Sequence, residues 1–307
     1  MNEELCDIAD YSTWKIVEFI DDGWSRDKKY YIEDYSGNKL LLRVSDISLF
    51  EIKKKEFQLI KRCNSLNFEM SQTVSFGVCN QHTNVYMLLS WVEGISLRSI
   101  LDQLPEQEQY ELGIQAGKIL KEIHSMPVDF GDLPDKDIKT TKLLKLANYE
   151  RGNIRIKNDQ FAINYVKNNI DKINLLSPVY QHGDFHVGNL ILTPDNQLGV
   201  IDFNRWDCGD RYEDFYKVQS FDVEVSVPFS VGQIHGYFDC QPPKDFWEAV
   251  AVYVAHASLY SIYWAAKFGE DEINGMKKRC LDAFEDYDQF TTVVPHWYRD
   301  NFMKYKI

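Results

Sequence analysis

The stretch QHGDFHVGNLILTPDNQLGVIDFNRWDCGDRYED, residues 181–214, decides the fold of this chain. Its start is crowded with polar residues, because two His, one Asp and one Asn fall within positions 182–189. Two apolar runs follow, at 189–193 and 198–203, and the turn-forming residues Pro194-Asp195-Asn196 separate them. This pattern predicts two short buried strands joined by a tight turn.

A hairpin of this kind brings its outer ends together, so we expect Asp184 and Asn189 to face Asp202. Two carboxylates and a carboxamide at one point favour Mg²⁺, which prefers oxygen ligands. Two other interpretations stay open at this point. His182 and His186 have the spacing of a helical zinc pair, although the flanking strands disfavour a helix there. The polar turn could also be purely structural.

Composition limits the classes of protein to which the chain can belong. Its 307 residues suffice for two lobes, and 44% hydrophobic with 26% charged residues is typical of a soluble globular protein. No apolar run is long enough to span a membrane, and the acidic start lacks a signal-peptide pattern. We therefore expect a cytoplasmic protein without a membrane partner. The six cysteines contain no C-x-x-C pair, which favours reduced thiols.

The net charge of −13 argues against a nucleic-acid partner, because a phosphate-backbone binder needs the opposite sign. The same charge is compatible with a cationic substrate. The alternative is that the chain is simply one of many acidic cytosolic proteins.

The N-terminal part predicts a sheet and one helix. Three apolar runs separated by turn signals lie within 14–44, and an uninterrupted helical pattern follows at 47–63. The loop at 21–29 could cover phosphates with its N–H groups and the Ser25 hydroxyl, although an ordinary hairpin turn is the alternative. Arg43 on the last strand and Glu56 on the helix are candidates for an ion pair, with Glu51 as a competing partner.

The rest of the chain is predicted to be mostly helical. Two strands at 75–89 lead into a hinge near 90–94, and long helical patterns then occupy 105–126, 142–173, 246–269 and 271–290, with a turn region at 225–232. We therefore predict an α+β, two-lobed fold. A small β-rich N-terminal lobe would comprise residues 1–92, and a larger, mainly helical C-terminal lobe would comprise 93–307.

The order of these features resembles the aminoglycoside phosphotransferase and choline kinase family, which has a protein-kinase-like fold. The resemblance rests on H-G-D-x-H-x-x-N at 182–189, on Ile201-Asp202-Phe203, and on G-D-x-x-x-D at 209–214. It implies a small-molecule kinase that uses ATP or GTP with Mg²⁺. The match follows the chain over nearly its whole length, and the motifs of the C-terminal lobe are the specific ones.

The resemblance also implies a role for each matching residue. Asp184 would orient the acceptor hydroxyl and take its proton, and Asn189 with Asp202 would hold Mg²⁺. His182 and His186 become supports of the loop. The nucleotide would be bound by Ser25, Arg43, Glu56, Ser90 and Val92.

The chain departs from the pattern of the family at two positions. Arg43 stands where protein kinases and many relatives have Lys, and Arg keeps the charge while binding phosphate in a bidentate manner. Asn204 follows Asp-Phe where kinases have Gly.

The acceptor is the least constrained part of the resemblance. An aminoglycoside-type antibiotic is the leading expectation, and choline, a sugar, a macrolide or another metabolite is the alternative, as is a catalytically silent nucleotide-binding sensor. Acidic side chains beside aromatic rings suit a cationic acceptor, although such residues are often solvated or part of the core. The candidates are Trp206, Asp207, Asp210, Asp222, Glu224, Trp264, Glu270 and Asp271. A monomer and a homodimer both remain open.

Overall fold

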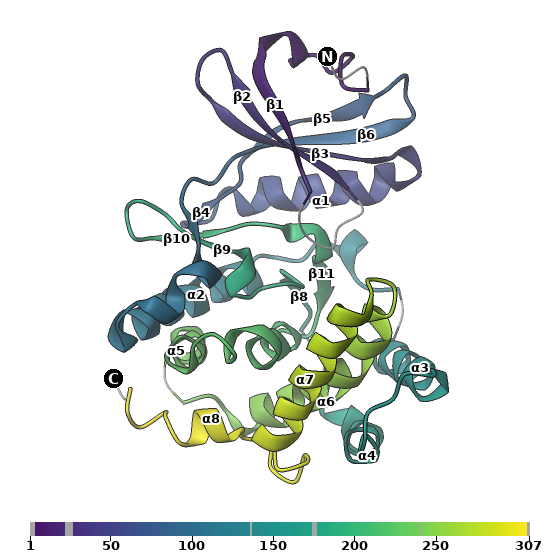
Figure 1. Ribbon diagram of the computed structural model, residues 1–307, viewed down its shortest axis with the longest axis vertical. Helices are drawn as coiled ribbons and strands as arrows, with labels where there is room; N and C mark the ends of the chain where they lie inside the picture. Colours follow the sequence, from purple (N-terminus) through teal and green to yellow (C-terminus); the bar gives the residue numbers. More distant parts are fainter. Residues whose placement is uncertain (1–3, 22–26, 136, 174–176, 240, 306–307) are drawn as a thin grey trace. The chain divides into compact units, whose positions relative to one another are not determined.

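The computed structural model describes residues 4–21, 27–135, 137–173, 177–239 and 241–305 (Figure 1). It divides into two compact units. The N-terminal unit comprises Met1–Ile95 together with Ile191–Asn204, and the C-terminal unit comprises Ser96–Leu190 together with Arg205–Ile307. The mixed α+β architecture predicted from the sequence is confirmed, with the strands concentrated in the first unit and the helices in the second. The predicted boundary between the lobes is a single one, at residue 92. In the structure, the later segment 191–204 also belongs to the first unit.

The N-terminal unit is built on a five-stranded antiparallel sheet of order β1-β2-β3-β6-β5 (Figure 1). The alternation of side chains in β3 assigns its residues to opposite faces, so that Leu42 and Val44 face one way and Arg43 the other. The strands are β1 (Trp14–Ile20), β2 (Lys28–Asp34), β3 (Lys39–Asp46), β5 (Thr73–Cys79) and β6 (Asn84–Ser90).

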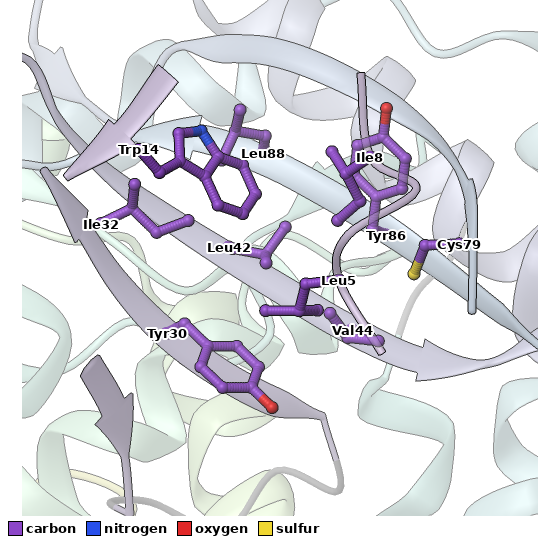
Figure 2. Packing of buried hydrophobic residues seen from close by; sticks show 10 residues of the cluster. All are labelled: Leu5, Ile8, Trp14, Tyr30, Ile32, Leu42, Val44, Cys79, Tyr86 and Leu88. Carbon is purple, nitrogen blue, oxygen red and sulfur yellow. The ribbon is translucent and has the colours of Figure 1, made fainter. Parts of the chain in front are cut away.

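One face of this sheet holds the apolar core of the unit, to which the N-terminal segment contributes Leu5 and Ile8 (Figure 2). Its other members come from the strands, and all are buried: Trp14, Tyr30, Ile32, Leu42, Val44, Cys79, Tyr86 and Leu88. Helix α1 (Phe50–Cys63) packs against β5 and β6 and follows the short 3₁₀ turn Ile47–Leu49. The predicted helix at 47–63 is therefore confirmed, with its first turn wound as 3₁₀.

The hairpin predicted from residues 189–203 is also confirmed. Strands β9 (Leu190–Leu192) and β10 (Leu198–Val200) lie in a small sheet of order β4-β10-β9-β7, with β4 (Glu69–Met70) and β7 (Ile95–Ser96). Asn196 adopts φ +57° in the turn, a conformation that Asn tolerates better than most residues. Both strands are shorter than predicted, because the chain leaves the ladder before reaching Asp202.

Two helices of the C-terminal unit, α2 (Glu106–His124) and α5 (Val227–Phe238), are in backbone contact. A Cβ on Gly113 would lie 2.2 Å from the Phe229 carbonyl oxygen, so only glycine permits this approach. The turn predicted at 225–232 is wrong, because α5 begins there. The Ser226 hydroxyl caps the helix by accepting from the Phe229 N–H, and Pro228 occupies its first turn, where proline is tolerated.

The helix predicted over 142–173 is wrong as one element, because the structure has α3 (Ile138–Arg151) and α4 (Gln160–Asn169). Gly152 ends α3, and Asn158 adopts φ +66° before α4 begins. Helix α6 (Lys244–Ala265) contacts α3, α4 and α7 (Glu270–Asp286), and is therefore the central helix of the unit. The remaining regular elements are β8 (Val179–Gln181), which pairs with β11 (Asp207–Gly209), and α8 (His296–Arg299).

The connections of the described chain contain further short turns of helix. These are 3₁₀ turns at Tyr11–Thr13, Leu97–Ser99, Leu101–Gln103, Phe130–Asp132, Ile170–Lys172, Val187–Asn189, Phe203–Arg205 and Glu213–Phe215, and a π-helical turn at Val218–Asp222. None of the helices within the described ranges is long and apolar enough to span a bilayer.

Candidate active site

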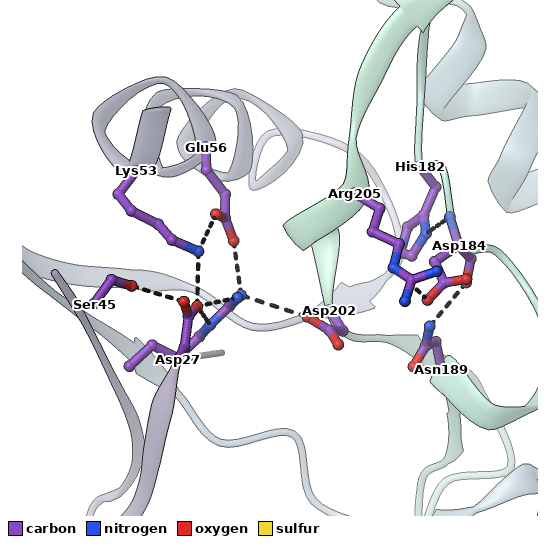
Figure 3. Close-up of polar contacts among 10 residues, drawn as sticks. Asp27, Ser45, Lys53, Glu56, His182, Asp184, Asn189, Asp202 and Arg205 are labelled. Atoms are coloured by element: carbon purple, nitrogen blue, oxygen red, sulfur yellow. Dashed lines mark hydrogen bonds and ion pairs between the residues drawn. The ribbon is translucent and has the colours of Figure 1, made fainter. Parts of the chain in front are cut away.

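The N-terminal unit buries a group of charged side chains that we call the Arg43 cluster: Arg43, Asp27, Lys53 and Glu56, with Ser45 (Figure 3). Arg43 donates from Nη1 to Glu56 Oε1 at 2.7 Å and from Nη2 to Asp27 Oδ2 at 2.6 Å. Lys53 Nζ donates to the same two carboxylates at 2.7 and 3.0 Å, and the Ser45 hydroxyl donates to Asp27. The cluster ties β3 to α1 by charge-assisted hydrogen bonds.

All four charged side chains of this cluster are at least nine-tenths buried. Burial opposes ionisation of Asp27, but the Arg43 guanidinium and the Lys53 ammonium lower its pKa to about 2. The predicted ion pair between Arg43 and Glu56 is confirmed. The competing partner, Glu51, is exposed on α1 and makes no ion pair within the described structure.

Sequence reasoning missed Asp27 and Lys53. A partial signal existed for Lys53, which lies three residues before Glu56 on α1 and so shares its helix face. Asp27 carried no such signal, because its partners Arg43 and Ser45 lie on a neighbouring strand.

Asp202 lies between β10 and the 3₁₀ turn Phe203–Arg205, and it adopts φ +67°, an unfavourable conformation for a residue other than glycine. Its side chain is about one-quarter exposed, with Oδ1 3.5 Å from Arg43 Nη1. The strained backbone thus holds a partly open carboxylate beside the Arg43 cluster (Figure 3).

The other described residues of this unit that are predicted to bind the nucleotide are not part of the Arg43 cluster. The Ser90 hydroxyl accepts from the Gln72 N–H, and the Ser90 N–H donates to the Gln72 carbonyl. Val92 is half-buried, close to Gly199 of β10. Ser25 lies outside the described residues.

In the C-terminal unit, Asp184 lies in the loop between β8 and the turn Val187–Asn189. The loop is fixed by Asp214, whose carboxylate accepts from the backbone N–H groups of His182 and Gly183 at 3.0 and 2.8 Å. Gly183 has φ +75°, and a Cβ there would lie 1.9 Å from the Arg205 carbonyl oxygen, so the glycine is required.

The Asp184 carboxylate is surrounded by positively charged groups (Figure 3 shows Arg205 beside it). The fully buried Lys217 ammonium donates to Oδ1, and Arg205 Nε lies 3.7 Å from Oδ2. His186 Nε2 is 3.6 Å from Oδ1. Burial opposes ionisation, but His186, Lys217 and Arg205 hold the pKa of Asp184 well below its usual range. No local pattern in the sequence indicates Lys217.

Asn189 is oriented by the same loop. Its side-chain amide donates from Nδ2 to the Asp184 carbonyl at 2.8 Å, and this bond directs the amide oxygen away from the loop backbone. A carboxamide oxygen is one of the oxygen donors that Mg²⁺ accepts, and so is a carboxylate such as that of Asp202.

The two histidines of the loop support it, as the resemblance implies. The His182 Nδ1 accepts from the Asp184 N–H, and His186 accepts from the Gly188 N–H while its ring stacks on Phe221. Across the described ranges, no three His, Cys, Asp or Glu side chains gather as a metal site by themselves. Nothing in this geometry favours the zinc interpretation.

The sequence matches a family of known proteins. Residues 16–252 match the phosphotransferase enzyme family. The chain belongs to this family. It is a phosphotransferase with an alcohol group as acceptor, and the resemblance drawn from its motifs is confirmed. None of the curated proteins matches the sequence.

The phosphotransferase shares its fold with solved aminoglycoside phosphotransferases. A GDP complex of aminoglycoside 2'-phosphotransferase-IIIa is 16% identical at a TM-score of 0.69, covering 90% of this chain and 93% of that one. A gentamicin complex of an APH(2") enzyme is 19% identical at 0.64, covering 87% and 91%. A complex of APH(4)-Ia with ADP and hygromycin B is 13% identical at 0.66, covering 89% and 94%. The kinase-like fold is therefore confirmed.

The predicted acceptor residues of the phosphotransferase differ in their surroundings. Asp210 is buried and accepts from the Tyr253 hydroxyl and the Tyr212 N–H, and Asp222 is fully buried, which raises its pKa well above the ordinary value. Glu224 pairs with Arg98 and Arg279. The others are less enclosed: Trp206 contacts the Tyr180 ring, Trp264 lies under Arg205, and Asp207, Glu270 and Asp271 are exposed.

Proposed function

We propose that this phosphotransferase moves the γ-phosphoryl group of ATP or GTP to a hydroxyl of a small molecule, with Mg²⁺. The observation that carries the proposal is the Asp184 carboxylate, which is held ionised by Lys217 and Arg205 in a loop fixed by Asp214. Phosphoryl transfer needs an oriented alcohol and neutralised charge more than covalent catalysis. The arrangement around Asp184 supports the first need.

Asp184 is proposed to accept a hydrogen bond from the acceptor hydroxyl and then its proton. Its pKa lies far below neutrality, so it is a weak base in the ground state. This suits a reaction with a loose transition state, in which the alcohol becomes acidic only as its bond to phosphorus forms. Arg205, beside the carboxylate, is placed to meet the charge of the transferred group.

Asn189 and Asp202 are proposed to hold Mg²⁺, which would neutralise the phosphate charge. Arg43, paired with Glu56, is proposed to bind the nucleotide phosphates, with Ser25, Ser90 and Val92 contributing to the same site. The ion pair with Glu56 supports this role, because it fixes a guanidinium near Asp202. A cytoplasmic location suits a nucleotide-using enzyme whose described cysteines form no disulfide with one another.

An aminoglycoside is the first acceptor to test, because similar structures are complexes with kanamycin, gentamicin or hygromycin B. Identities of 12–19% leave the acceptor side chains free to differ. Choline, sugars, macrolides and other alcohols therefore belong in the same screen.

The test is an acceptor screen with the purified full-length chain, Mg²⁺ and either ATP or GTP. Nucleoside diphosphate release would be coupled to a reporter, and mass spectrometry would identify the phosphorylated product. We expect at least one acceptor to raise turnover and Asp184→Asn to abolish the rise. Nucleotide binding without turnover of any acceptor would contradict the proposal and favour a silent nucleotide-binding sensor.

Arg43→Lys is the variant with which to test the nucleotide role. Arg43→Ala would also leave buried carboxylates short of a cation, so it confuses folding with binding. Lys keeps the charge but loses the bidentate geometry. We expect weaker nucleotide binding with a folded protein, and an unchanged affinity would contradict the assignment.

A further inference from the structure

The aromatic face of α6 that could receive a cationic acceptor is already covered by the protein's own cations. The Arg205 guanidinium lies 5.1 Å from the Trp264 ring centroid, and Lys267 lies 5.2 Å from the same ring. Lys145 of α3 lies 5.2 Å from the Tyr260 ring. An ammonium group of a ligand would have to displace one of these cations before it could use the ring.

The acids that could recognise an amine are largely committed as well. Glu213 pairs with Lys142, and Asp210 is buried with its carboxylate hydrogen-bonded inside the unit. Asp207 is exposed and accepts from the neighbouring Cys208 N–H. The acids 270–272, of which Glu270 and Asp271 are exposed, lie in the first turn of α7, where they complement the helix dipole.

Two cations on this face, Lys145 and Lys267, have no carboxylate partner among the described residues. Within the part of the chain that the structure describes, neither Lys145 nor Lys267 lies within ion-pair distance of an acid. Lys145 is half-buried, and burial followed by repulsion from Lys142 lowers its pKa. Attraction to Glu213 and Asp207 offsets these two effects only in part, so the pKa stays lowered, and a bound anion would stabilise the half-buried ammonium further.

These cations are connected to the reacting carboxylate. Arg205 contacts Asp184 on one side and the Trp264 ring on the other. Tyr260 lies one helical turn before Trp264, so its partner Lys145 follows along the same face of α6. A small molecule with its hydroxyl at Asp184 would therefore extend past Arg205 towards Lys267 and Lys145, in a chain whose overall charge is −13.

We propose that the acceptor carries a carboxylate or phosphate group besides its hydroxyl, and that Lys145 and Lys267 recognise this anion. The inference rests on the proposed function, since it names the acceptor class of the same site. It replaces a polycationic antibiotic with a hydroxylated acid or a sugar phosphate. The shared chemistry is an anionic group that neutralises unpaired ammonium groups.

The experiment compares acceptors that share a six-carbon skeleton and differ in charge: glucose, gluconate (which is open-chain), glucose 6-phosphate and glucosamine, with kanamycin as a polycation. Turnover is measured with the full-length chain, Mg²⁺ and the preferred nucleotide. We expect kcat/KM to be higher for gluconate or glucose 6-phosphate than for glucose, and lowest for glucosamine and kanamycin. Whether gluconate or glucose 6-phosphate is preferred shows whether the recognised anion is a carboxylate or a phosphate. Preference for glucosamine or kanamycin would overturn the inference while leaving the phosphotransferase function intact.

Variants test the two lysines directly. Lys145→Met and Lys267→Met should each raise KM for the anionic acceptor roughly tenfold, the effect of about 1.4 kcal/mol, while kcat and the KM for glucose change little. Lys139→Met is the matched control, because Lys139 also lies on α3 but pairs with Asp171. An unchanged KM for the anion in both lysine variants would refute the role of these residues.

If none of these sugars is turned over, binding decides the question. Thermal unfolding of the nucleotide-loaded protein would be followed with gluconate, glucose 6-phosphate, glucose or glucosamine. Stabilisation by an anion that is lost in the Lys145→Met, Lys267→Met double variant supports the inference, and equal responses to all four contradict it. Failure to bind nucleotide would count instead against the proposed function.

Discussion

In the N-terminal unit, two cations, Arg43 and Lys53, share two carboxylates, Asp27 and Glu56. In the C-terminal unit, one carboxylate, Asp184, is shared by Lys217 and Arg205. The first group is electrically balanced and links a strand to a helix. The second has an excess of positive charge, which keeps its carboxylate ionised and leaves one cation, Arg205, partly exposed. Charge balance thus distinguishes a cluster that can stabilise the fold unaided from one that is suited to an anionic partner.

The largest expected effect comes from removing the carboxylate at the centre of the second group. Asp184→Asn should lower kcat roughly a thousandfold, because the acceptor hydroxyl loses its base. It should also lower the free energy of unfolding by about 3–5 kcal/mol, since Lys217 remains buried without its counter-ion. Steady-state kinetics and urea unfolding measure the two effects.

The double variant Asp184→Asn, Lys217→Met separates these two effects. Removing the buried cation as well should restore part of the unfolding free energy but none of the activity. Recovery of activity in the double variant would show that Asp184 matters only through its pairing with Lys217.

A smaller effect is expected in the balanced group. Glu56→Gln keeps the shape of the side chain but removes a charge that Arg43 and Lys53 share, so the free energy of unfolding should fall by about 3 kcal/mol. Glu51→Gln on the same helix is exposed and unpaired within the described structure, and should change it by less than about 0.5 kcal/mol. Equal effects of the two substitutions would mean that the cluster contributes nothing specific.

The smallest expected effect is a loss of stability at acidic pH. The folded-state pKa of Asp27 is about 2, below the ordinary 3.8, so its ionised form stabilises the fold above pH 4. That contribution, about 2 kcal/mol, is lost as the pH falls from about 4 towards 2. Urea unfolding of the wild type and of Asp27→Asn at pH 6 and pH 3 measures it. The difference in stability between the two proteins should shrink at pH 3, and a constant difference would exclude this role for Asp27.

The parts that could be predicted from the sequence are those with a local pattern. The hairpin follows from two apolar runs and a Pro-Asp-Asn turn, and α1 follows from its helical spacing. Arg43 and Glu56 could be paired because a strand leads directly into a helix that packs on the sheet. The motif at 182–189 was specific enough to indicate the family.

The parts that could not be predicted depend on contacts between distant residues. Lys217 meets a carboxylate 33 residues earlier, and Asp27 meets a guanidinium 16 residues later. The glycines of α5 resemble turn residues in the sequence, yet they serve contact with α2. Net charge does not report local charge: this acidic chain places Lys145 and Lys267 over aromatic rings of its C-terminal unit, with no carboxylate within ion-pair distance among the described residues.

The pairing of Asp27 with Arg43 also affects how Arg43 could bind a nucleotide. The Arg43 guanidinium already holds an oxyanion, because the Asp27 carboxylate accepts from both Nε and Nη2. Nucleotide binding at Arg43 would then be an exchange of one anion for another. The apparent affinity for nucleotide would then depend on how much more strongly the guanidinium binds a phosphate than it binds Asp27. The Asp27 carboxylate would act as an intramolecular competitor, and the strength of its pairing would set the nucleotide concentration that the enzyme needs.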